Sequence, residues 1–365
     1  MAALGLRKAA PSQHRLVELD VLRGLAALCV VLFHYSIRYE QLYNTAEAPT
    51  LAMTRGYLGV EFFFCISGFV IFMTLERTRR PMDFVVSRFS RLWPAYVVAI
   101  LITFSVVSVF GLAGKETTPV QALINVTMFQ ELFHVPHVDA VYWSLQVELI
   151  FYCWMFIAYV TGQLKRIRIF LWVGLAPPLV YFIAHRYFGN DLSYVAGTIL
   201  LITYIPYFTI GIAAYNIYAR RDPGYQDLLL MLSAAVVAGI CLSIVEGALA
   251  LCAAVILWAV ARGYLVYVAR GPFLFLGTIS YTLYLLHQNI GYVVIRSVTR
   301  HGISMDVAIA IAISCSIGLA ALLTWSVEKP AQVWLRGLYR RLSGSVISAP
   351  TLGAEATRAL REPLR

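Results

Sequence analysis

The sequence predicts an all-α polytopic membrane protein, and three observations support this fold class. Of the 365 residues, 60% are hydrophobic and only 13% are charged, whereas a soluble domain carries about 25% charged residues. The mean hydropathy is +0.74. Apolar stretches of about 20 residues, the length that an α-helix needs to cross a bilayer, recur along the chain. The basic residues lie between these stretches, so the net charge of +10 reflects membrane topology and we expect no nucleic-acid partner.

About ten transmembrane helices are expected, with ends defined to within a few residues. The weakest boundary separates the seventh and eighth, where only Glu246 and Gly247 interrupt the apolar run. An even number of spans places both termini on the same side of the membrane. The expected spans are 18–38, 57–76, 93–113, 143–162, 168–187, 198–218, 228–245, 248–268, 273–295 and 306–326.

The distribution of Lys and Arg predicts the orientation. Of the 29 basic residues, 22 fall in the N-terminal segment, in alternate loops and in the C-terminal tail, and six fall in the other loops. Because basic residues are retained on the cytoplasmic side, both termini are expected inside the cell. Residues 1–15 then form a cytoplasmic segment, 16–335 the transmembrane domain, and 336–365 a basic cytoplasmic tail that is expected to be disordered. Membrane lipids are the surrounding partner.

Arg23 and His34 are the ionisable residues that stand out within the apolar part of the first span. A charge inside the bilayer is costly and is therefore a functional candidate. Eleven residues are close to three helical turns, so both side chains share one face and lie about 16.5 Å apart along the axis. The alternative is an arginine that pairs with Asp20 near the interface and a histidine that only packs.

The stretch "RFSRLWPAY" places Arg88 and Arg91 in the inside loop just before the third span. Two guanidinium groups at i and i+3 can clamp a phosphate. The alternative is that they only retain this loop inside and contact anionic lipids.

The stretch "YWSLQVELIFY" places Trp143 at the outer boundary and Glu148 about 7.5 Å deeper. That depth resembles the depth expected for His34, so we expect a His34–Glu148 pair in which the carboxylate orients the imidazole as a general base. The alternative is a structural glutamate that pairs with another buried polar group.

Other polar residues have more than one interpretation. Ser67–Gly68 in the second span indicates close helix packing. Glu61 could line a pocket or lie at the interface, and His287 in the outer half of the ninth span could contact an acceptor, form a pocket wall or only pack. His134 and His137 have HxxH spacing, which alone is a weak metal signal, so no metal is expected.

Six motifs in order resemble the acyltransferase 3 family of integral membrane enzymes over residues 16–335. They are "ELDVLRGLAALCVVLFHY", "GYLGVEFFFCISGFVIF", "RFSRLWPAY", "WSLQVELIFY", "ISYTLYLLH" and "VEKP". In the family, the arginine and histidine of the first motif are essential, which carries over to Arg23 and His34. The RxxR motif carries over to Arg88 and Arg91.

The resemblance implies transfer of an acyl group, usually acetyl, from cytoplasmic acyl-CoA to a hydroxyl of an extracytoplasmic glycan or lipid-linked glycan. It also implies a multi-pass protein of the bacterial cytoplasmic (inner) membrane. Acetyl-CoA is then the donor substrate, held by Arg23, Arg88 and Arg91. His34 and Glu148 are expected to be catalytic. The acceptor is expected to contact Trp143, His287 and Glu61.

Two mechanisms and two other classes of protein remain open. His34 could remove a proton from the acceptor hydroxyl as it attacks the thioester. It could instead form a transient acyl-imidazole. A proton-coupled exporter would also use buried His, Glu and Arg, although the chain shows no internal repeat of the kind that builds many transporters. A non-catalytic scaffold or sensor would tolerate the loss of His34.

Overall fold

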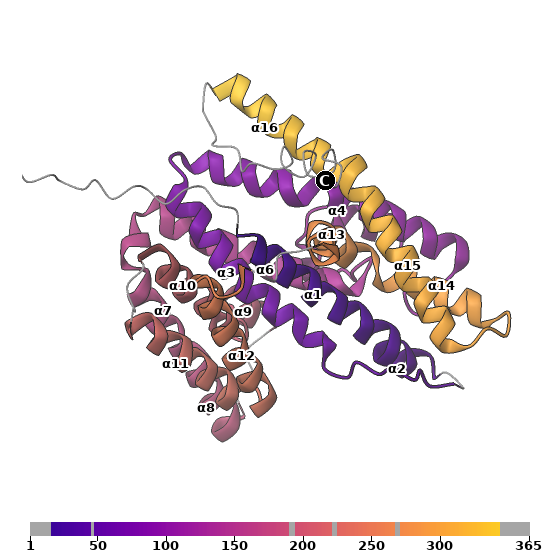
Figure 1. The fold of residues 1–365 in the computed structure, drawn as a ribbon, viewed down its shortest axis with the longest axis horizontal. Coiled ribbons are helices and arrows are strands. Elements are labelled where there is room, and N and C mark those ends of the chain that lie inside the picture. Colours follow the sequence, from indigo (N-terminus) through magenta and orange to yellow (C-terminus); the bar gives the residue numbers. More distant parts are fainter. Residues whose placement is uncertain (1–15, 45–46, 190–193, 221–224, 267–270, 344–365) are drawn as a thin grey trace, which may run out of the picture.

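The structure is a computed structural model, which describes residues 16–44, 47–189, 194–220, 225–266 and 271–343 (Figure 1). Over these ranges the regular structure is helical and contains no strand, so the all-α prediction is confirmed. The helices are α1 (Val17–Phe33), α2 (Tyr39–Tyr43), α3 (Gly59–Arg77), α4 (Pro81–Phe110), α5 (Pro119–Asn125), α6 (Trp143–Val160), α7 (Ile167–Gly174), α8 (Ala176–Phe188), α9 (Tyr194–Ile199), α10 (Ile205–Arg220), α11 (Tyr225–Cys241), α12 (Ile244–Ala261), α13 (Pro272–Leu286), α14 (Gln288–Thr299), α15 (Met305–Leu323) and α16 (Lys329–Ser343).

Two π-helical turns, His34–Arg38 and Thr324–Glu328, join helices end to end. The first continues α1 into α2, and the second continues α15 into α16. A π turn inside an α-helix occurs frequently at functional sites, and His34 is the first residue of one of them.

Within the described ranges, six helical segments are long and apolar enough to cross a membrane. Tyr225–Cys241 and Pro272–Leu286 are shorter apolar helices. The protein is therefore an integral membrane protein by its helices, whereas the ten-span count and the cytoplasmic termini remain predictions. The six segments are Gly56–Arg77, Pro81–Phe110, Ala140–Val160, Gln163–Phe188, Ile244–Ala261 and Met305–Ser343.

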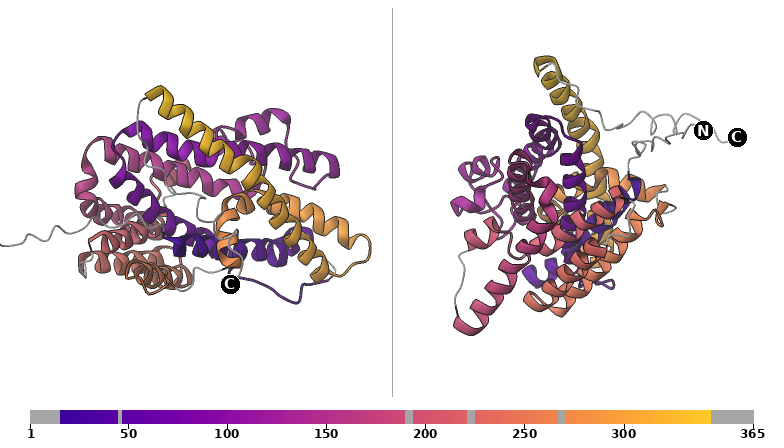
Figure 2. Two further views of the ribbon diagram at one scale, coloured as in Figure 1. Left: turned by 45° about the horizontal axis from the view of Figure 1, so that its top comes forward. Right: turned by 90° about the vertical axis from the view of Figure 1, so that its left-hand side faces the viewer.

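The largest differences from the predicted boundaries concern α4 and α16. Helix α4 begins at Pro81, a residue suited to the first helical position, and not near 93, so Arg88 and Arg91 belong to the helix itself. Helix α16 extends to Ser343, so the expectation of disorder is wrong for 336–343. The apolar run ends near 326, but the following residues form an amphipathic helix that packs against α4 (Figure 2). Residues 1–15 and 344–365 lie outside the described residues.

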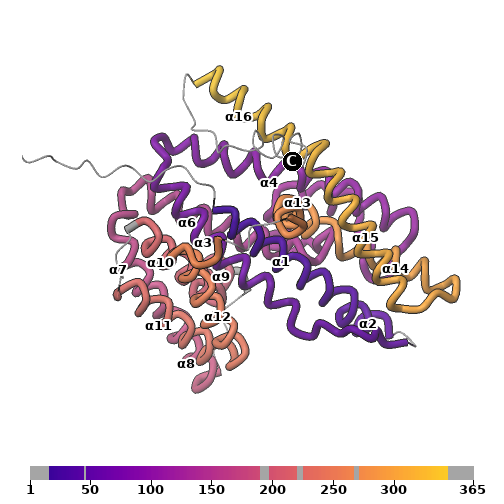
Figure 3. Tube along the Cα trace, in the orientation of Figure 1, coloured from indigo at the N-terminus to yellow at the C-terminus, as the bar shows by residue number. Residues whose placement is uncertain are grey.

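Several predicted spans are divided. The fifth is broken at Leu175 between α7 and α8, and the ninth at His287 between α13 and α14. The seventh and eighth are separated near Leu242–Ser243, four residues before the expected interruption at Glu246. The helices α7, α8 and α10–α12 gather at one side of the molecule and α14 and α15 at the other, with α13 near the middle (Figure 3).

Glycines permit the closest helix contacts. A Cβ added at Gly68 of α3 would lie 2.4 Å from the carbonyl oxygen of Phe208 on α10. This bears out the interpretation of close helix packing for Gly68, whereas Ser67 lines a cavity and donates a hydrogen bond to Glu148. In the same way, a Cβ at Gly24 of α1 would lie 2.5 Å from the backbone nitrogen of Gly277 on α13. Both pairs of helices therefore approach with backbone against backbone.

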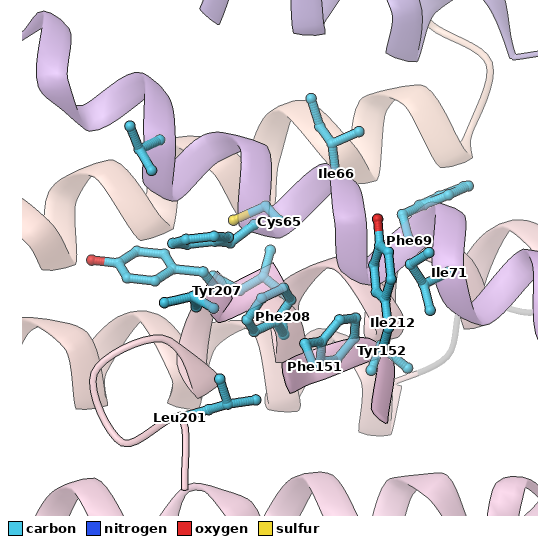
Figure 4. Close-up of a cluster of buried hydrophobic side chains, with 14 of the residues drawn as sticks. Cys65, Ile66, Phe69, Ile71, Phe151, Tyr152, Leu201, Tyr207, Phe208 and Ile212 are labelled. Atoms are coloured by element: carbon cyan, nitrogen blue, oxygen red, sulfur yellow. The ribbon is translucent and has the colours of Figure 1, made fainter. Parts of the chain in front are cut away.

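The core between α3, α6 and α10 is aromatic (Figure 4). The rings of Phe151 and Phe208 stack with centroids 3.8 Å apart, and Phe69 of α3 is fully buried beside them. Such pairs add stability beyond the apolar area that they bury. The core attaches α6 to α3, and these two helices carry the carboxylate of Glu148 and the hydroxyls of Ser67, Ser144 and Tyr152 at the site.

Candidate active site

A cavity opens between α1, α3, α4, α6 and α13. It contains about 660 Å³ of empty space, including its open mouth. Three arginines lie along it, so we call it the arginine cavity. Its lining combines these guanidinium groups with a carboxylate, several hydroxyls and apolar side chains. The residues are Arg23, Val60, Phe63, Phe64, Ile66, Ser67, Val70, Ile71, Arg88, Arg91, Ser144, Leu145, Glu148, Tyr152, Ser280, Tyr281 and Tyr284.

The structure brings Arg23, Arg88 and Arg91 together at this cavity, although they come from α1 and α4. Arg91 repels the charges of both Arg23 and Arg88. The Nε of Arg88 is buried, and no described residue accepts a hydrogen bond from it. The residues predicted to bind the donor therefore form one group with unused hydrogen-bonding capacity for an anion.

Glu148 lies with the arginines and not with His34, so the predicted pairing is wrong. Its Oε1 accepts hydrogen bonds from Ser67 Oγ and from the hydroxyl of Tyr152, both at 2.6 Å. It attracts the charges of Arg23 and Arg88. The carboxylate thus balances part of the arginine charge, which corresponds to the alternative of a glutamate paired with other buried polar groups.

The error in the depth of Glu148 has a simple cause. Helix α6 begins beside the middle of the predicted ninth span. The Ser144 Oγ lies 2.7 Å from the hydroxyl of Tyr284, and the Tyr142 hydroxyl donates to the carbonyl of Leu285. The start of α6 is therefore level with residues that precede His287 in α13, and Glu148 lies one helical turn beyond Ser144.

His34 pairs with the other histidine, His287, instead. The His287 Nε2 and the His34 Nδ1 are 3.1 Å apart, and the ring centroids are 4.9 Å apart. His287 is completely buried (0% exposed), whereas His34 is only partly buried. The Tyr35 hydroxyl donates to the carbonyl oxygen of His287 at 2.6 Å. We call His34 and His287 the histidine pair.

Backbone carbonyls around the histidine pair assign the ring protons. The His287 Nδ1 faces the carbonyl oxygens of Tyr284 at 2.9 Å and Leu283 at 3.2 Å, so this nitrogen carries the proton. The His287 Nε2 is then an acceptor. The His34 Nδ1 is 2.9 Å from the carbonyl oxygen of Val30, so it is also protonated and donates to both partners. The Nε2 of a neutral His34 consequently has a free lone pair.

Tyr284 connects the arginine cavity to the histidine pair. Its ring lines the cavity and lies 5.8 Å from the ring of His287, centroid to centroid. Sequence reasoning missed Tyr284, Ser144 and Tyr152 as site residues. Tyr152 could have been found, because it follows Glu148 by four residues and therefore lies on the same helix face. The contact of Tyr284 with Ser144 joins helices 140 residues apart and has no local signal.

Trp143 and Glu61 lie beside the cavity and are not part of its lining. The Trp143 ring packs on Phe64 and Tyr204. The Glu61 Oε2 is buried, and within the described chain it has no hydrogen-bond partner. Glu246, which accepts from the hydroxyl of Tyr207 at 2.5 Å, repels the charge of Glu61.

The HxxH residues have local partners in the outer loop. His137 Nδ1 lies 2.7 Å from Gln130 Nε2, and its Nε2 lies 3.5 Å from a carboxylate oxygen of Glu131. His134 adopts a left-handed backbone conformation with φ of 55°. Among the described residues, no group of three or more His, Cys, Asp or Glu is arranged to hold a metal ion.

These features define an all-helical membrane protein with a polar cavity that leads to a buried histidine pair. Residues 16–326 match the family described as "Acyltransferase domain". The chain therefore belongs to the acyltransferase 3 family, which makes it a membrane acyltransferase by family.

A curated relative is similar over a shorter segment. It is "Protein 2 in picA locus" from Rhizobium radiobacter, 37% identical over 91 residues. The match covers 24% of this chain and 42% of that protein, so it spans less than half the length of the relative. No solved structure matches the chain with significance.

Proposed function

We propose that the protein transfers an acyl group, acetyl in the first instance, from cytoplasmic acyl-CoA to a hydroxyl of a glycan on the other side of the bacterial inner membrane. The observation that carries the proposal is the arginine cavity itself. It has guanidinium groups along its wall and reaches Tyr284, next to the histidine pair. An acyl-CoA has its charge at one end and its thioester at the other, so its shape fits this arrangement.

The distances support this assignment of the two ends. Eleven residues of continuous helix separate Arg23 from His34, which corresponds to about 16.5 Å. The pantetheine arm would extend over this length between phosphates held by the arginines and a thioester held near His34. The guanidinium groups of Arg88 and Arg91 suit the diphosphate, because each can donate two hydrogen bonds to phosphate oxygens.

In the preferred mechanism, the Nε2 of His34 accepts the proton of the acceptor hydroxyl while the hydroxyl oxygen attacks the thioester carbonyl carbon. A C–O bond forms and the C–S bond breaks, and the protonated His34 returns its proton to the leaving CoA thiolate. The products are a glycan ester and free CoA. General base catalysis of this type contributes about 10²–10⁴-fold to a rate.

His287 would act as a positioning residue in this mechanism. Its bare Nε2 accepts from the His34 Nδ1–H, which keeps the proton off the reacting nitrogen. A transient acyl group on His34 Nε2 is the second mechanism, and the same tautomer suits it. Either route requires the free lone pair on Nε2.

The acceptor would approach His34 from the outer half of the protein. Glu61 and Trp143 are the proposed acceptor contacts, because each directly adjoins a residue of the cavity lining, Val60 and Ser144 respectively. The unpartnered carboxylate oxygen of Glu61 could accept a hydrogen bond from a sugar hydroxyl. The arginines would bind the donor substrate, acyl-CoA. No role is proposed for a metal.

The test uses the full chain in vesicles that contain lipid-linked glycans. Radiolabelled acetyl-CoA is added to the side that bears the termini, and the label in the glycan fraction is measured. We expect protein-dependent labelling, and none with an analogue in which a methylene group replaces the thioester sulfur. Movement of glycan across the membrane without acetyl-CoA, with no labelling when acetyl-CoA is present, would contradict the proposal and favour a proton-coupled exporter.

A further inference from the structure

Helix α16 adds two guanidinium groups beside the arginine cavity. Arg336 is buried, with 8% of its surface exposed. Its Nε donates to Ser90 Oγ at 3.1 Å, and a terminal nitrogen donates to the carbonyl oxygen of Ser87 at 3.4 Å. Arg340 follows one turn later, and its Nε is buried with no hydrogen-bond partner anywhere in the described chain.

The charge around Arg336 is unbalanced. Arg88, Arg91 and Arg340 all repel its guanidinium group. Among the described residues, its two hydrogen-bond acceptors are an uncharged hydroxyl and a backbone carbonyl. A buried guanidinium group without a counter-ion is costly. An anion bound between these arginines would remove that cost, and phosphate esters offer the oxygens that guanidinium groups bind best.

Membrane topology alone does not explain this arrangement. Arg341, the next residue after Arg340, is exposed, as expected for an arginine that only retains the helix inside. Apolar side chains on the other face of α16 are exposed, which suits contact with lipid. They are Trp334 (66%), Leu338 (41%) and Leu342 (79%). Thus α16 presents exposed apolar residues on one side and, on the other, the buried Arg336 and the buried Nε of Arg340.

We propose that Arg336 and Arg340 form a second phosphate subsite, which binds the phosphate monoester on the nucleotide end of the acyl-CoA donor. This inference rests on the proposed function. Arg336 contacts Ser87 and Ser90 of α4, and Tyr339 contacts Asp83 nearer the start of that helix. Helix α16 therefore runs antiparallel to α4, and Arg340 lies on the side of Arg336 that points away from Arg91 and the cavity. The order of the two pairs matches the order of phosphates in CoA, where the diphosphate lies nearer to the pantetheine arm than the ribose 3′-phosphate.

The test compares two donors that differ only in this phosphate. Binding of acetyl-CoA and 3′-dephospho-acetyl-CoA is measured by calorimetry on the full chain in phosphatidylcholine nanodiscs. We expect the wild type to bind acetyl-CoA at least about tenfold more tightly, the scale of one charged hydrogen bond. Arg340→Gln should remove this preference by weakening acetyl-CoA alone. Arg336→Gln is a second variant with the same expectation.

Two controls separate charge from structure. Arg341→Gln removes the same charge from an exposed neighbour and should leave both affinities unchanged. Tyr339→Phe removes the hydrogen bond from the Tyr339 hydroxyl to Asp83 Oδ1, which is 3.0 Å long and holds α16 on α4. If Tyr339→Phe reproduced the selective loss, docking of the helix and not the subsite would be responsible, and the inference would be overturned.

The remaining outcomes also decide the matter. Equal weakening of both donors by Arg340→Gln, or no weakening, would refute the subsite while leaving the proposed function intact. Failure of the folded wild type to bind either donor would instead refute the proposed function. A phosphate on a lipid headgroup is the other source of this chemistry. If Arg340→Gln altered donor binding only in nanodiscs that contain phosphatidylglycerol, the subsite would belong to the lipid.

Discussion

The polar groups at the two ends of α1 differ in how far their hydrogen-bonding capacity is already used. Around Arg23, the arginine cavity is open, gathers guanidinium groups from α1 and α4, and leaves hydrogen-bonding capacity unused. Around His34, the histidine pair is packed between helices, and backbone carbonyls engage both Nδ1 atoms. The first arrangement suits a binding site that waits for an anion. The second suits a reaction that needs one nitrogen in one protonation state.

The largest expected effect comes from His34→Ala, which should abolish the chemistry at the histidine pair while leaving donor binding at the arginine cavity intact. Transfer should fall by about 10²–10⁴-fold, because the base is lost. The dissociation constant of acetyl-CoA should stay within about twofold, because the arginine cavity is unchanged. Rates from labelled acetyl transfer and affinities from calorimetry check both parts. Full activity in this variant would contradict a role for His34 in chemistry.

The double variant Arg88→Glu/Arg91→Glu should instead impair donor binding at the arginine cavity. Acetyl-CoA affinity should fall by at least about 100-fold, since charged hydrogen bonds are replaced by repulsion. The melting temperature serves as the control for folding, and Arg341→Glu serves as a matched charge reversal at an exposed site. An unchanged dissociation constant in a folded variant would rule out the arginines as the donor clamp.

A smaller effect is expected at His287. His287→Leu removes the acceptor for the His34 Nδ1–H, so kcat should fall about tenfold to 100-fold and the pH dependence of kcat should shift. His287→Gln supplies an amide oxygen as acceptor and should restore part of kcat. Donor affinity should not change in either variant. Equal losses in both variants would indicate a packing residue and not a positioning residue.

Glu148→Gln tests whether this carboxylate belongs to the arginine end. The amide oxygen can still accept from Ser67 and Tyr152, so folding should persist. Donor affinity should change only severalfold, because one of several charges at the cavity is removed. The pH dependence of kcat should be unaltered. A displaced pH profile would instead restore the idea that Glu148 orients His34.

The smallest effect concerns the outer loop, at Asp139. Burial raises the pKa of Asp139 to about 7, well above its unfolded value of about 3.9. Between about pH 4 and 7, Asp139 therefore holds a proton in the folded state that it has lost in the unfolded state. The stability that this protonation contributes is fully present below about pH 4 and is lost as the pH rises through 7. Melting temperatures should fall over this window, and Asp139→Asn should flatten the decline.

The sequence correctly predicted the spacing of Arg23 and His34 along α1, but it did not predict which residues of other helices contact them. Arg23 and His34 share one uninterrupted helix, so spacing alone determined their separation. Glu148 was assigned the wrong depth because the sequence shows where α6 begins along the chain but not how far inside the membrane domain that point lies. The contact between Ser144 and Tyr284, which reveals the depth, depends on tertiary packing.

Helix α16 was missed for a different reason. The search for spans followed hydropathy, and hydropathy falls after residue 326. The pattern that continues the helix is amphipathic, with Arg336 and Arg340 four residues apart on one face. The π turn His34–Arg38 has no apparent sequence signal, because it contains no proline or glycine that would mark an irregular turn.

The contacts between α1 and α13 have a consequence for insertions and deletions. Gly24 meets Gly277, and ten residues later in each helix His34 meets His287. The two helices therefore run in the same direction with equal numbering between their two points of contact. A residue added to or removed from either interval would turn one imidazole away from the other by about 100°. Only a matched change in both helices would preserve the pair, so the lengths of these two segments should vary together or not at all.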